Sequence, residues 1–368
     1  MKIMITGGHL APAIALIEEL RKKKDIKVIF VGRKFALDSE KTISLEYREI
    51  VENLKIPFIN LMAGRLTRAL TLKSVVNFFR IPTGFMSALS IVAGEKPDLI
   101  FSFGGFLALP VAFWGWVMRI PVYTHEQTAN PGLANRIIAK FSKRIFVAFE
   151  ETAKFFNPEK VVVCGNPIRK AVFEIVNKPF EIKKDRPVIY ITGGSLGSHS
   201  INLHVKKILK ELLADFIVIH QAGDTKEYHD YEDLMATRGL LPEELSDRYY
   251  LRKHFFVSEI GYVYSLTDLC IGRAGANTFF ELLAKRIPAI FIPLPWSAGR
   301  EQQKHAEVFA RNGIGEIFHQ VETSDKLLRL IRSTVADIDS YRKNFNKLNS
   351  LYKSNAAKIL ADAAYAKA

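Results

Sequence analysis

The sequence has 368 residues, of which 48% are hydrophobic and 24% are charged. A chain of this length and composition can bury large cores, so we exclude a disordered protein and expect two domains. The formal net charge of +14 favours an anionic partner, for which phosphates, nucleic acid and an anionic membrane surface are all candidates.

Cysteine content and hydropathy restrict the setting in which the protein works. Cys164 and Cys270 are the only cysteines, and each stands in or beside an apolar run, which predicts buried thiols in a reducing compartment rather than a disulfide or metal site. The chain opens into a predicted strand without a basic leader, so we expect no secretory signal. The most apolar segment, 107–117, has about half the length of a membrane-spanning helix, which predicts a soluble or peripheral protein.

The first turn of the chain combines two glycines with a histidine. Residues 3–5 predict a strand, and the apolar spacing that follows predicts a helix with Pro12 at its first position. Gly7 and Gly8 let the backbone turn sharply and present N–H groups to an anion, although such glycines often serve packing alone. His9 stands at the mouth of the turn, where parallel α/β sheets bind ligands. The turn lacks the G-x-G-x-x-G spacing of a dinucleotide site.

Residues 63–89 alternate basic and apolar side chains, and Pro82 and Gly84 interrupt the pattern, which predicts part helix and part loop. An ordinary core helix with solvated arginines explains the alternation. A surface that docks on an anionic membrane explains it too, because aromatic side chains beside basic ones insert shallowly among headgroups. Trp114 and Trp116 can extend such a surface.

Two further polar clusters follow predicted strands in the first half. The strand 99–103 leads to Gly104 and Gly105, and the strand 122–124 leads to the sequence H-E-Q at 125–127. Parallel α/β sheets place their ligands at the carboxyl ends of the strands. These clusters are therefore candidates for one binding site together with the first turn.

The opening pattern returns in the second half. A polar, lysine-rich segment at 177–186 predicts a linker, and beyond it the strand 188–191 runs into T-G-G-S-L-G-S at 192–198 and a helix at 201–213. The same strand, T-G-G turn and helix in both halves indicate two similarly wound domains with ligands between them.

The second half also carries a strand-like run at 255–257 and the strand 269–271, which leads to G-R-A-G-A-N-T at 272–278. A helix is predicted to follow from Phe279, and Glu281 lies in its first turn. A carboxylate there stabilises the helix dipole, and it can equally accept two hydrogen bonds from a ribose diol.

The motifs T-G-G-H, F-G-G-F, H-E-Q, G-N-P-I-R, G-G-S-L-G, G-R-A-G-A-N-T-F-F-E and R-E-Q-Q together resemble the MurG family, over roughly residues 3–317. The resemblance implies the GT-B fold, an α/β fold of two Rossmann-like domains with parallel sheets facing a central cleft. It implies an acceptor-binding and membrane-associated domain at 1–170 and a UDP-sugar donor-binding domain at 171–335. Residues 336–368 would form C-terminal helices that can pack back on the first domain.

The resemblance also implies an activity. The family transfers N-acetylglucosamine from UDP-N-acetylglucosamine to a lipid-linked muramyl-pentapeptide, the step from lipid I to lipid II in peptidoglycan synthesis, by an inverting hexosyl transfer. The partners implied are this donor, the undecaprenyl-linked acceptor and the anionic cytoplasmic face of the cell membrane. Within residues 3–317 no Asp-x-Asp motif accompanies these motifs, so we expect neither a metal nor a cofactor, and no nucleic-acid reader motif is present.

Alternatives from other classes stay open at this point. A GT-B transferase for another lipid acceptor and a UDP-sugar epimerase are the nearest rival enzymes. A nucleotide-sugar-binding protein without catalysis is a further alternative.

Site residues follow from the matched positions. His9 is implied as the catalytic base, with Glu126 orienting it or sharing the proton transfer. The residues implied to bind substrate are Thr6, Gly7, Gly8, Gly104, Gly105, Thr128, Asn130 and Arg169 in the first domain, and Ser195, Val257, Ala276, Asn277, Thr278, Glu281, Gln302 and Gln303 in the second.

Several of these positions carry a stated role in the family. Arg169 and Ser195 would contact the diphosphate, and Val257 would contact uracil through its backbone. Ala276, Asn277 and Thr278 would touch the nucleotide, Glu281 the ribose hydroxyls, and Gln302 with Gln303 the sugar hydroxyls.

Three departures concern the acceptor side. Met4 and Ile5 stand where the family usually has two further glycines, Phe106 replaces a usual tyrosine, and Thr128 replaces a usual asparagine, for which Asn130 can substitute. We therefore expect the acceptor pocket to differ from the family pattern more than the donor pocket does.

Overall fold

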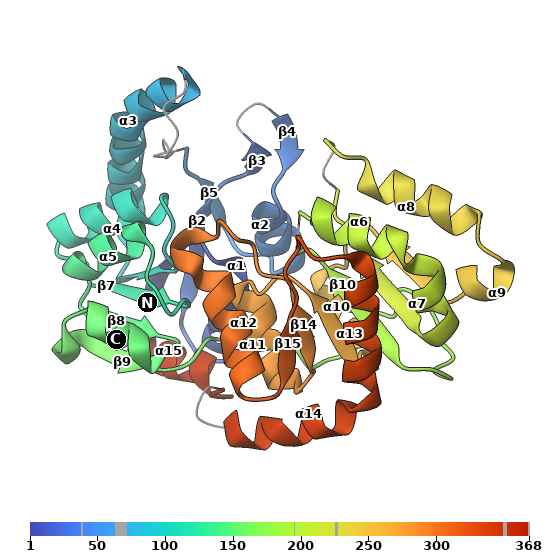
Figure 1. Ribbon diagram of the computed structural model, residues 1–368. Coiled ribbons are helices and arrows are strands. Elements are labelled where there is room, and N and C mark those ends of the chain that lie inside the picture. Colours follow the sequence, from blue (N-terminus) through green and yellow to red (C-terminus); the bar gives the residue numbers. More distant parts are fainter. Residues whose placement is uncertain (38–39, 63–71, 195, 225–226, 349–351, 367–368) are drawn as a thin grey trace. The chain divides into compact units, whose positions relative to one another are not determined.

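The computed structural model describes residues 1–37, 40–62, 72–194, 196–224, 227–348 and 352–366 (Figure 1). The chain forms two compact units. The first consists of Met1–Arg169 with Lys353–Ala368, and the second of Lys170–Tyr352. Residues 336–348, predicted to belong with the C-terminal helices that return to the first domain, lie in the second unit.

Within its described residues, the first unit contains a seven-stranded parallel sheet in the order β5-β2-β1-β6-β7-β8-β9. Its strands are rich in apolar residues on both faces, as expected when helices cover both sides of a parallel sheet. A short antiparallel pair, β3 and β4, stands apart from it. The strands are β1 (Lys2–Thr6), β2 (Lys27–Gly32), β3 (Phe35–Leu37), β4 (Glu40–Ile43), β5 (Phe58–Asn60), β6 (Leu99–Ser102), β7 (Val122–Glu126), β8 (Arg144–Val147) and β9 (Val161–Val163).

The first unit also contains helices of varied length. They are α1 (Leu10–Leu20), α2 (Leu45–Tyr47), η1 (Arg48–Asn53), α3 (Leu72–Glu95), α4 (Ala108–Val117), α5 (Leu133–Phe141), η2 (Glu150–Phe155), η3 (Pro158–Lys160) and α15 (Ala356–Tyr365). The last helix, α15, returns to the first unit and buries Leu360 and Ala364 in the same core as Ile14 and Ile17 of α1. Lys353 fastens the returning chain by donating from Nζ to the carbonyl of Val163 at 2.9 Å.

The second unit repeats this architecture with a six-stranded parallel sheet, counted over its described residues, in the order β12-β11-β10-β13-β14-β15. The strands are β10 (Val188–Thr192), β11 (Ile217–Gln221), β12 (Tyr249–Arg252), β13 (Leu269–Gly272), β14 (Ala289–Phe291) and β15 (Gly315–Ile317). The helices are η4 (Lys170–Val172), α6 (His199–Lys207), α7 (Leu209–Asp215), α8 (Asp230–Gly239), α9 (Glu243–Ser246), α10 (Val257–Leu266), α11 (Ala276–Lys285), η5 (Ala298–Arg300), α12 (Glu301–Arg311), α13 (Ser324–Ala336), α14 (Ile338–Asn344) and η6 (Phe345–Leu348).

The repeat predicted from the sequence is confirmed by the sheet order. β1 and β10, the strands before the two T-G-G turns, each stand third in their sheet, and the order of the strands reverses beside them. In open parallel sheets the crevice at such a switch point is where ligands bind. The switch points lie between β1 and β6 and between β10 and β13.

Two local predictions in the second half are wrong. The run at 255–257 is no strand, because Tyr249–Arg252 supplies β12 and Val257 opens α10. Residues 177–186 are no linker, since the chain passes between the units at 169–170. The cause is Phe180, whose ring packs against Tyr250 at 4.7 Å and Tyr262 at 5.8 Å and so holds the segment on the second unit.

The basic and aromatic stretch is only partly within the described residues, which omit 63–71. From Leu72 the chain is helical through Pro82 and Gly84, so the predicted interruption there is wrong. Packing explains this, because α3 lies along α4 and the Trp114 Nε1–H donates to the Phe85 carbonyl at 2.7 Å. Among the helices described, none combines the length and the apolar character that crossing a bilayer requires.

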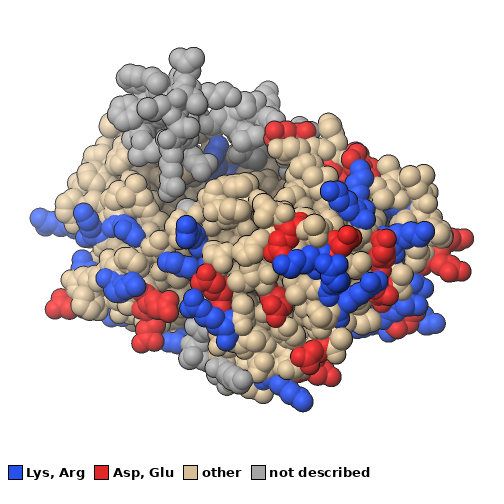
Figure 2. All heavy atoms as spheres, in the orientation of Figure 1, with Lys and Arg blue, Asp and Glu red and all other residues tan. Residues whose placement is uncertain are grey.

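Surface charge is mixed on the face that Figure 2 shows. Acidic and basic side chains alternate over the second unit there, so the positive excess forms no continuous basic patch on that part of the surface. A duplex-binding protein gathers its basic residues on one face. This face of the second unit lacks that arrangement.

Candidate active site

Two glycine turns meet at the switch point of the first unit. Gly8, in the turn after β1, has φ 147°, and a Cβ atom on it would lie 2.2 Å from the carbonyl oxygen of Gly104, in the turn after β6. A Cβ on Gly105 would lie 3.1 Å from the Gly8 Cα. Only glycine permits this approach of two backbones. These glycines therefore serve the packing of the turns, and their contact with substrate stays a prediction.

The start of the first turn belongs to the sheet. Thr6 ends β1 with no exposed surface, and the Gly7 N–H donates to the carbonyl of Val31 at 2.9 Å. This N–H is thus occupied and does not point at an anion. Met4 and Ile5, which replace two usual glycines, are fully buried within β1, on opposite faces of the sheet.

His9 directly precedes α1, and its ring is half-buried. Its Nδ1 atom lies 2.7 Å from Nε2 of Gln127, the residue after β7. Burial lowers the pKa of His9, and the carboxylate of Glu126 opposes this shift. The imidazole is therefore largely neutral at pH 7 and able to accept a proton, as a general base must be.

Glu126 ends β7 and is 2% exposed. It accepts four hydrogen bonds: from the Thr128 N–H at 2.9 Å and Oγ1 at 2.8 Å, from the Gly132 N–H at 3.2 Å and from Asn135 Nδ2 at 2.8 Å. These bonds fix the loop between β7 and α5, and they leave little room for proton transfer through Glu126 itself. Its contribution to His9 is electrostatic.

The loop after Glu126 contains two predicted substrate-binding residues. Thr128 is 5% exposed and committed to Glu126, whereas Asn130 is half-buried and accepts from Arg136 Nη2 at 3.1 Å through Oδ1. Phe106, the other departure on this side, lies under the guanidinium of Arg33 at 5.8 Å.

His125 connects β7 to the segment that carries Arg169. Its Nε2–H donates to the carbonyl of Gly165 at 3.1 Å, and burial lowers its pKa to about 4. The ring is therefore neutral at physiological pH and acts as a fixed donor rather than as an acid or base. The half-buried Arg169 follows as the last residue before the chain passes to the second unit.

Buried polar atoms without a protein partner gather at the carboxyl end of this sheet. Hydrogen-bonding groups are rarely left unpaired when buried, because each costs free energy. Such atoms mark a place where a polar ligand can supply the missing bonds. Among the described residues they include Thr6 Oγ1, His125 Nδ1, Gln127 Oε1 and Asn166 Oδ1.

Glu46, which the sequence gave no reason to select, lies against the first turn. Its carboxylate occupies the space of missing side chains, since a Cβ on Gly7 would lie 1.9 Å and one on Gly32 2.4 Å from its oxygens. The Arg33 N–H donates to it at 2.9 Å. Burial nevertheless raises its pKa to about 6.

The equivalent turn of the second unit is longer and contains two glycines in left-handed conformations. Gly194 has φ 88° and Gly197 φ 79°, a conformation that glycine adopts without strain. Gln221 clamps the turn by donating from Nε2 to the Gly194 carbonyl at 2.8 Å and accepting from the Phe255 N–H at 3.1 Å. The predicted diphosphate ligand Ser195 lies outside the described residues.

Arg273 lies in the G-R-A-G turn after β13 and faces the turn after β10. The residues predicted from the sequence to bind substrate did not include it. Its Nη2 donates to Ser198 Oγ at 2.7 Å, to Ser200 Oγ at 2.8 Å and to Gln320 Oε1 at 2.9 Å. All three oxygens are neutral, so they hold the guanidinium without neutralising its charge. Burial lowers its pKa to about 10, which leaves it cationic. A half-buried cation beside a glycine turn suits a diphosphate.

Glu281 lies in the second turn of α11, not in its first, because the helix begins at Ala276. It is 6% exposed and accepts from the Tyr264 hydroxyl at 2.9 Å through Oε2. Burial and the Glu281 carboxyl raise the pKa of Tyr264, so the hydroxyl remains a donor. This bond fixes the orientation of the carboxylate. Asn277 and Thr278, on the first turn of α11, are half-buried.

The remaining predicted donor contacts lie on two other helices. Val257 is the first residue of α10 and half-buried. Gln302 accepts from the Leu294 N–H at 3.0 Å and so shapes the loop before α12, whereas Gln303 donates along the helix to Glu307 at 3.2 Å.

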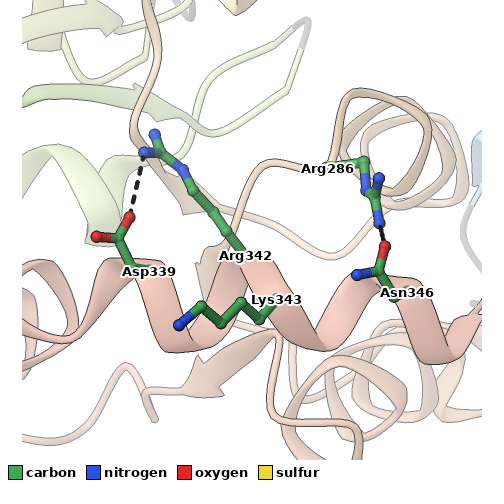
Figure 3. Close-up of a pocket in the computed structure, with 5 residues that line it drawn as sticks. All are labelled: Arg286, Asp339, Arg342, Lys343 and Asn346. Carbon is green, nitrogen blue, oxygen red and sulfur yellow. Dashed lines mark hydrogen bonds and ion pairs between the residues drawn. The ribbon is translucent and has the colours of Figure 1, made fainter.

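A pocket elsewhere in the second unit is not part of this arrangement. Figure 3 shows Asp339, Arg342 and Lys343 on α14 and Asn346 just beyond it, with Arg286 reaching Asn346 from the end of α11. Because α11 ends and β14 begins beside it, the pocket belongs to the amino ends of the strands. Ligands of parallel sheets bind at the opposite edge. In the part of the chain described, no three potential metal ligands converge.

Family models match both units. The model for the glycosyltransferase family 28 N-terminal domain matches residues 6–147, and that for the glycosyltransferase family 28 C-terminal domain matches residues 188–362. A Bacillus cereus protein is 33% identical over 96% of this chain and 94% of its own length. It is named UDP-N-acetylglucosamine--N-acetylmuramyl-(pentapeptide) pyrophosphoryl-undecaprenol N-acetylglucosamine transferase 2.

Solved structures share the fold. The crystal structure of Acinetobacter baumannii MurG matches with a TM-score of 0.69 at 24% identity over 98% of both chains. A UDP-N-acetylglucosamine 2-epimerase matches with a TM-score of 0.66 at 13% identity, over 97% of this chain and 94% of its own. The fold is therefore common to transferases and epimerases and does not by itself choose between them.

Proposed function

The chain belongs to the MurG family of glycosyltransferases, and from that membership we propose that it transfers N-acetylglucosamine from UDP-N-acetylglucosamine to a muramyl-pentapeptide on undecaprenyl diphosphate. The observation that carries this proposal is the 33% identity with a transferase of that name along 96% of the chain. The reaction is the step from lipid I to lipid II in peptidoglycan synthesis.

The chemistry is a single inverting displacement. A hydroxyl of the acceptor sugar forms a bond to the anomeric carbon of the donor, the bond from that carbon to the diphosphate oxygen breaks, and UDP leaves. The hydroxyl proton passes to His9, whose burial keeps the imidazole neutral. Glu126 raises the proton affinity of His9 through its charge without moving from its four hydrogen bonds.

Donor binding is assigned to the second unit. The turn at 193–198 and the guanidinium of Arg273 hold the leaving diphosphate, and they stabilise the negative charge that develops on it. Glu281, oriented by Tyr264, accepts from the ribose hydroxyls. Gln302 and Gln303 contact the sugar, and Val257 contacts uracil through its backbone.

Peripheral attachment to the cytoplasmic face of the membrane completes the proposal. Met86 on α3 and Trp116 and Val117 on α4 are exposed to 58%, 52% and 47%. Arg119 follows α4 by two residues, Lys140 lies on α5, and both are exposed. We call these five residues the docking face. The ring of Trp116 packs at a tilt against Phe141, with the ring centres 5.1 Å apart, which supports it at the surface, whereas Trp114 is turned inward toward Phe85. Exposed apolar side chains together with cations suit an anionic bilayer.

An acceptor-dependent transfer assay tests the activity. Radiolabelled UDP-N-acetylglucosamine is incubated with and without the muramyl-pentapeptide lipid, and label in the lipid and free UDP are measured. Transfer only with the acceptor supports the proposal. Interconversion of the sugar without acceptor would support an epimerase instead, and tight donor binding without either reaction would support a binding protein.

A further inference from the structure

Gln127 is placed to control the chemistry of His9. It is 4% exposed, it follows directly on Glu126, and its amide contacts His9 Nδ1 at 2.7 Å across 118 residues of sequence. Because Glu126 is held by four hydrogen bonds, the backbone that carries Gln127 is firmly positioned. Any proton that His9 exchanges with substrate must therefore pass through Nε2, the ring nitrogen that Gln127 leaves free.

The direction of this hydrogen bond decides what His9 can do. With the amide nitrogen of Gln127 donating to Nδ1, a neutral imidazole carries its proton on Nε2 and has no lone pair there to accept another. With the carbonyl oxygen Oε1 at the same place, Nδ1 carries the proton and Nε2 is a base. A carboxamide has nearly the same shape in both orientations, so one contact accommodates either.

Two observations favour the second orientation. The first is the distance of 2.7 Å between the amide atom of Gln127 and His9 Nδ1. This distance lies at the short end of the range for N–H···O hydrogen bonds, so it suits an oxygen at that place. With the nitrogen at His9, Oε1 is left as a buried oxygen without a protein partner. Turning the amide gives that oxygen the ring N–H as a donor.

We propose that Gln127 is the positioning residue for His9: its Oε1 accepts from Nδ1–H, which selects the tautomer with a free lone pair on Nε2. This assignment rests on the proposed function, in which His9 is the base. A neutral acceptor suits the task, because a carboxylate in its place would bind the proton on the ring more firmly. The other titratable groups that act on His9 electrostatically are Glu126 and His125.

The tautomer can be read directly from the wild-type protein. With ¹⁵N-labelled histidine at pH 8, the two ring nitrogens of His9 give distinct shifts and couplings, and the His9→Ala protein assigns them. We expect the proton on Nδ1. A proton on Nε2 would overturn the proposal. The measurement uses no substrate, so it decides the tautomer even where the transfer assay fails.

Kinetics of two variants supply the functional test. Gln127→Met removes the acceptor, so kcat should fall about tenfold while the KM for UDP-N-acetylglucosamine stays unchanged. Gln127→Glu should recover most of that kcat at high pH and move the acid limb of the pH profile upward by about one unit. An acid limb that is the same in both variants and the wild type contradicts the proposal. Thermal unfolding and UDP affinity of each variant show whether the fold is intact.

Discussion

The two T-G-G turns occupy the same position in their sheets but differ in length and in the conformation of their glycines. The turn between β1 and α1 consists of residues 7–9 only, and the backbone of Gly8 packs closely against that of Gly104 in the neighbouring turn. The turn between β10 and α6 runs over residues 193–198, and Gly194 and Gly197 have left-handed conformations. The short turn presents a histidine at a helix start, whereas the long turn can curve around a ligand.

Charge separates the two turns further. Beside the long turn lies Arg273, a half-buried cation held by neutral oxygens. Beside the short turn lie two carboxyl groups, Glu46 and Glu126, and an imidazole with a lowered pKa. A diphosphate is stabilised by the first setting and repelled by the second. This difference in charge supports the proposal that the second unit holds the leaving group and the first unit takes the proton.

Replacement of His9 has the largest expected effect on the difference between the two turns. His9→Ala should lower kcat about 1000-fold, because the attacking hydroxyl loses its base, while affinity for UDP stays the same. In the wild type, the acid limb of kcat should lie below pH 6.5, since burial lowers the pKa of His9 and the ring stays neutral to lower pH. Transfer kinetics from pH 5 to 9 and calorimetry with UDP measure both effects.

His319→Ala is the matched control, because this histidine is exposed on the second unit. It should leave kcat and the pH profile unchanged. If His9→Ala kept wild-type turnover at saturating substrates, His9 would not be the base. The proposed difference in chemistry between the two turns would then be wrong.

Arg273 tests the other side of the comparison. Arg273→Ala should lower kcat/KM about 100-fold and weaken UDP binding, because the diphosphate loses its cationic partner. Arg332→Ala is the control, since that arginine is paired with Asp215 on the surface. Calorimetry with UDP and with uridine separates the roles: uridine, which has no phosphate, should bind both proteins alike. Equal loss of uridine affinity would indicate a collapsed turn rather than a missing charge.

How much of this could be read from the sequence depends on the distance between partners. The glycine turns, their repeat and the strands that precede them are local patterns, and the structure confirms them, whereas the strand predicted at 255–257 is wrong. Arg273 stood in a quoted motif, but its partners Ser198, Ser200 and Gln320 lie 75, 73 and 47 residues away, so its role was invisible until the chain folded.

The same reason explains the acidic setting of the first turn. No sequence pattern around Glu46 predicts that its carboxylate fills the space beside Gly7 and Gly32. Conversely, Pro82 suggested a break that packing of α3 on α4 overrides. Local sequence rules therefore located the turns, whereas tertiary contacts decided which chemistry each turn has.

Trp116 tests whether attachment to the membrane belongs to the first unit. Trp116→Asp should weaken binding to anionic vesicles about tenfold, because the docking face loses an aromatic side chain and gains a like charge to the lipid. Transfer to a short-chain, water-soluble acceptor should be unaffected. Trp296→Asp is the control: Trp296 is more exposed, at 72%, but lies on the second unit. Vesicle sedimentation that responds equally to both variants would refute a docking face confined to the first unit.

Glu46 gives the smallest effect and sharpens the electrostatic contrast. The pKa of Glu46 is raised from 4.5 to about 6, so ionisation of its carboxyl group lowers the stability of the fold. The full cost is present above pH 6, and it is absent below pH 4.5, where the group is protonated in both the folded and the unfolded state. Glu46→Gln removes that cost and should raise the midpoint of thermal unfolding of the first unit by about 2 °C at pH 8. The gain should vanish at pH 4.5. Glu151→Gln, at an exposed glutamate of the same unit, should show no such pH dependence. A gain that is equal at both pH values would mean that packing, not charge, sets the cost of placing Glu46 beside the turn.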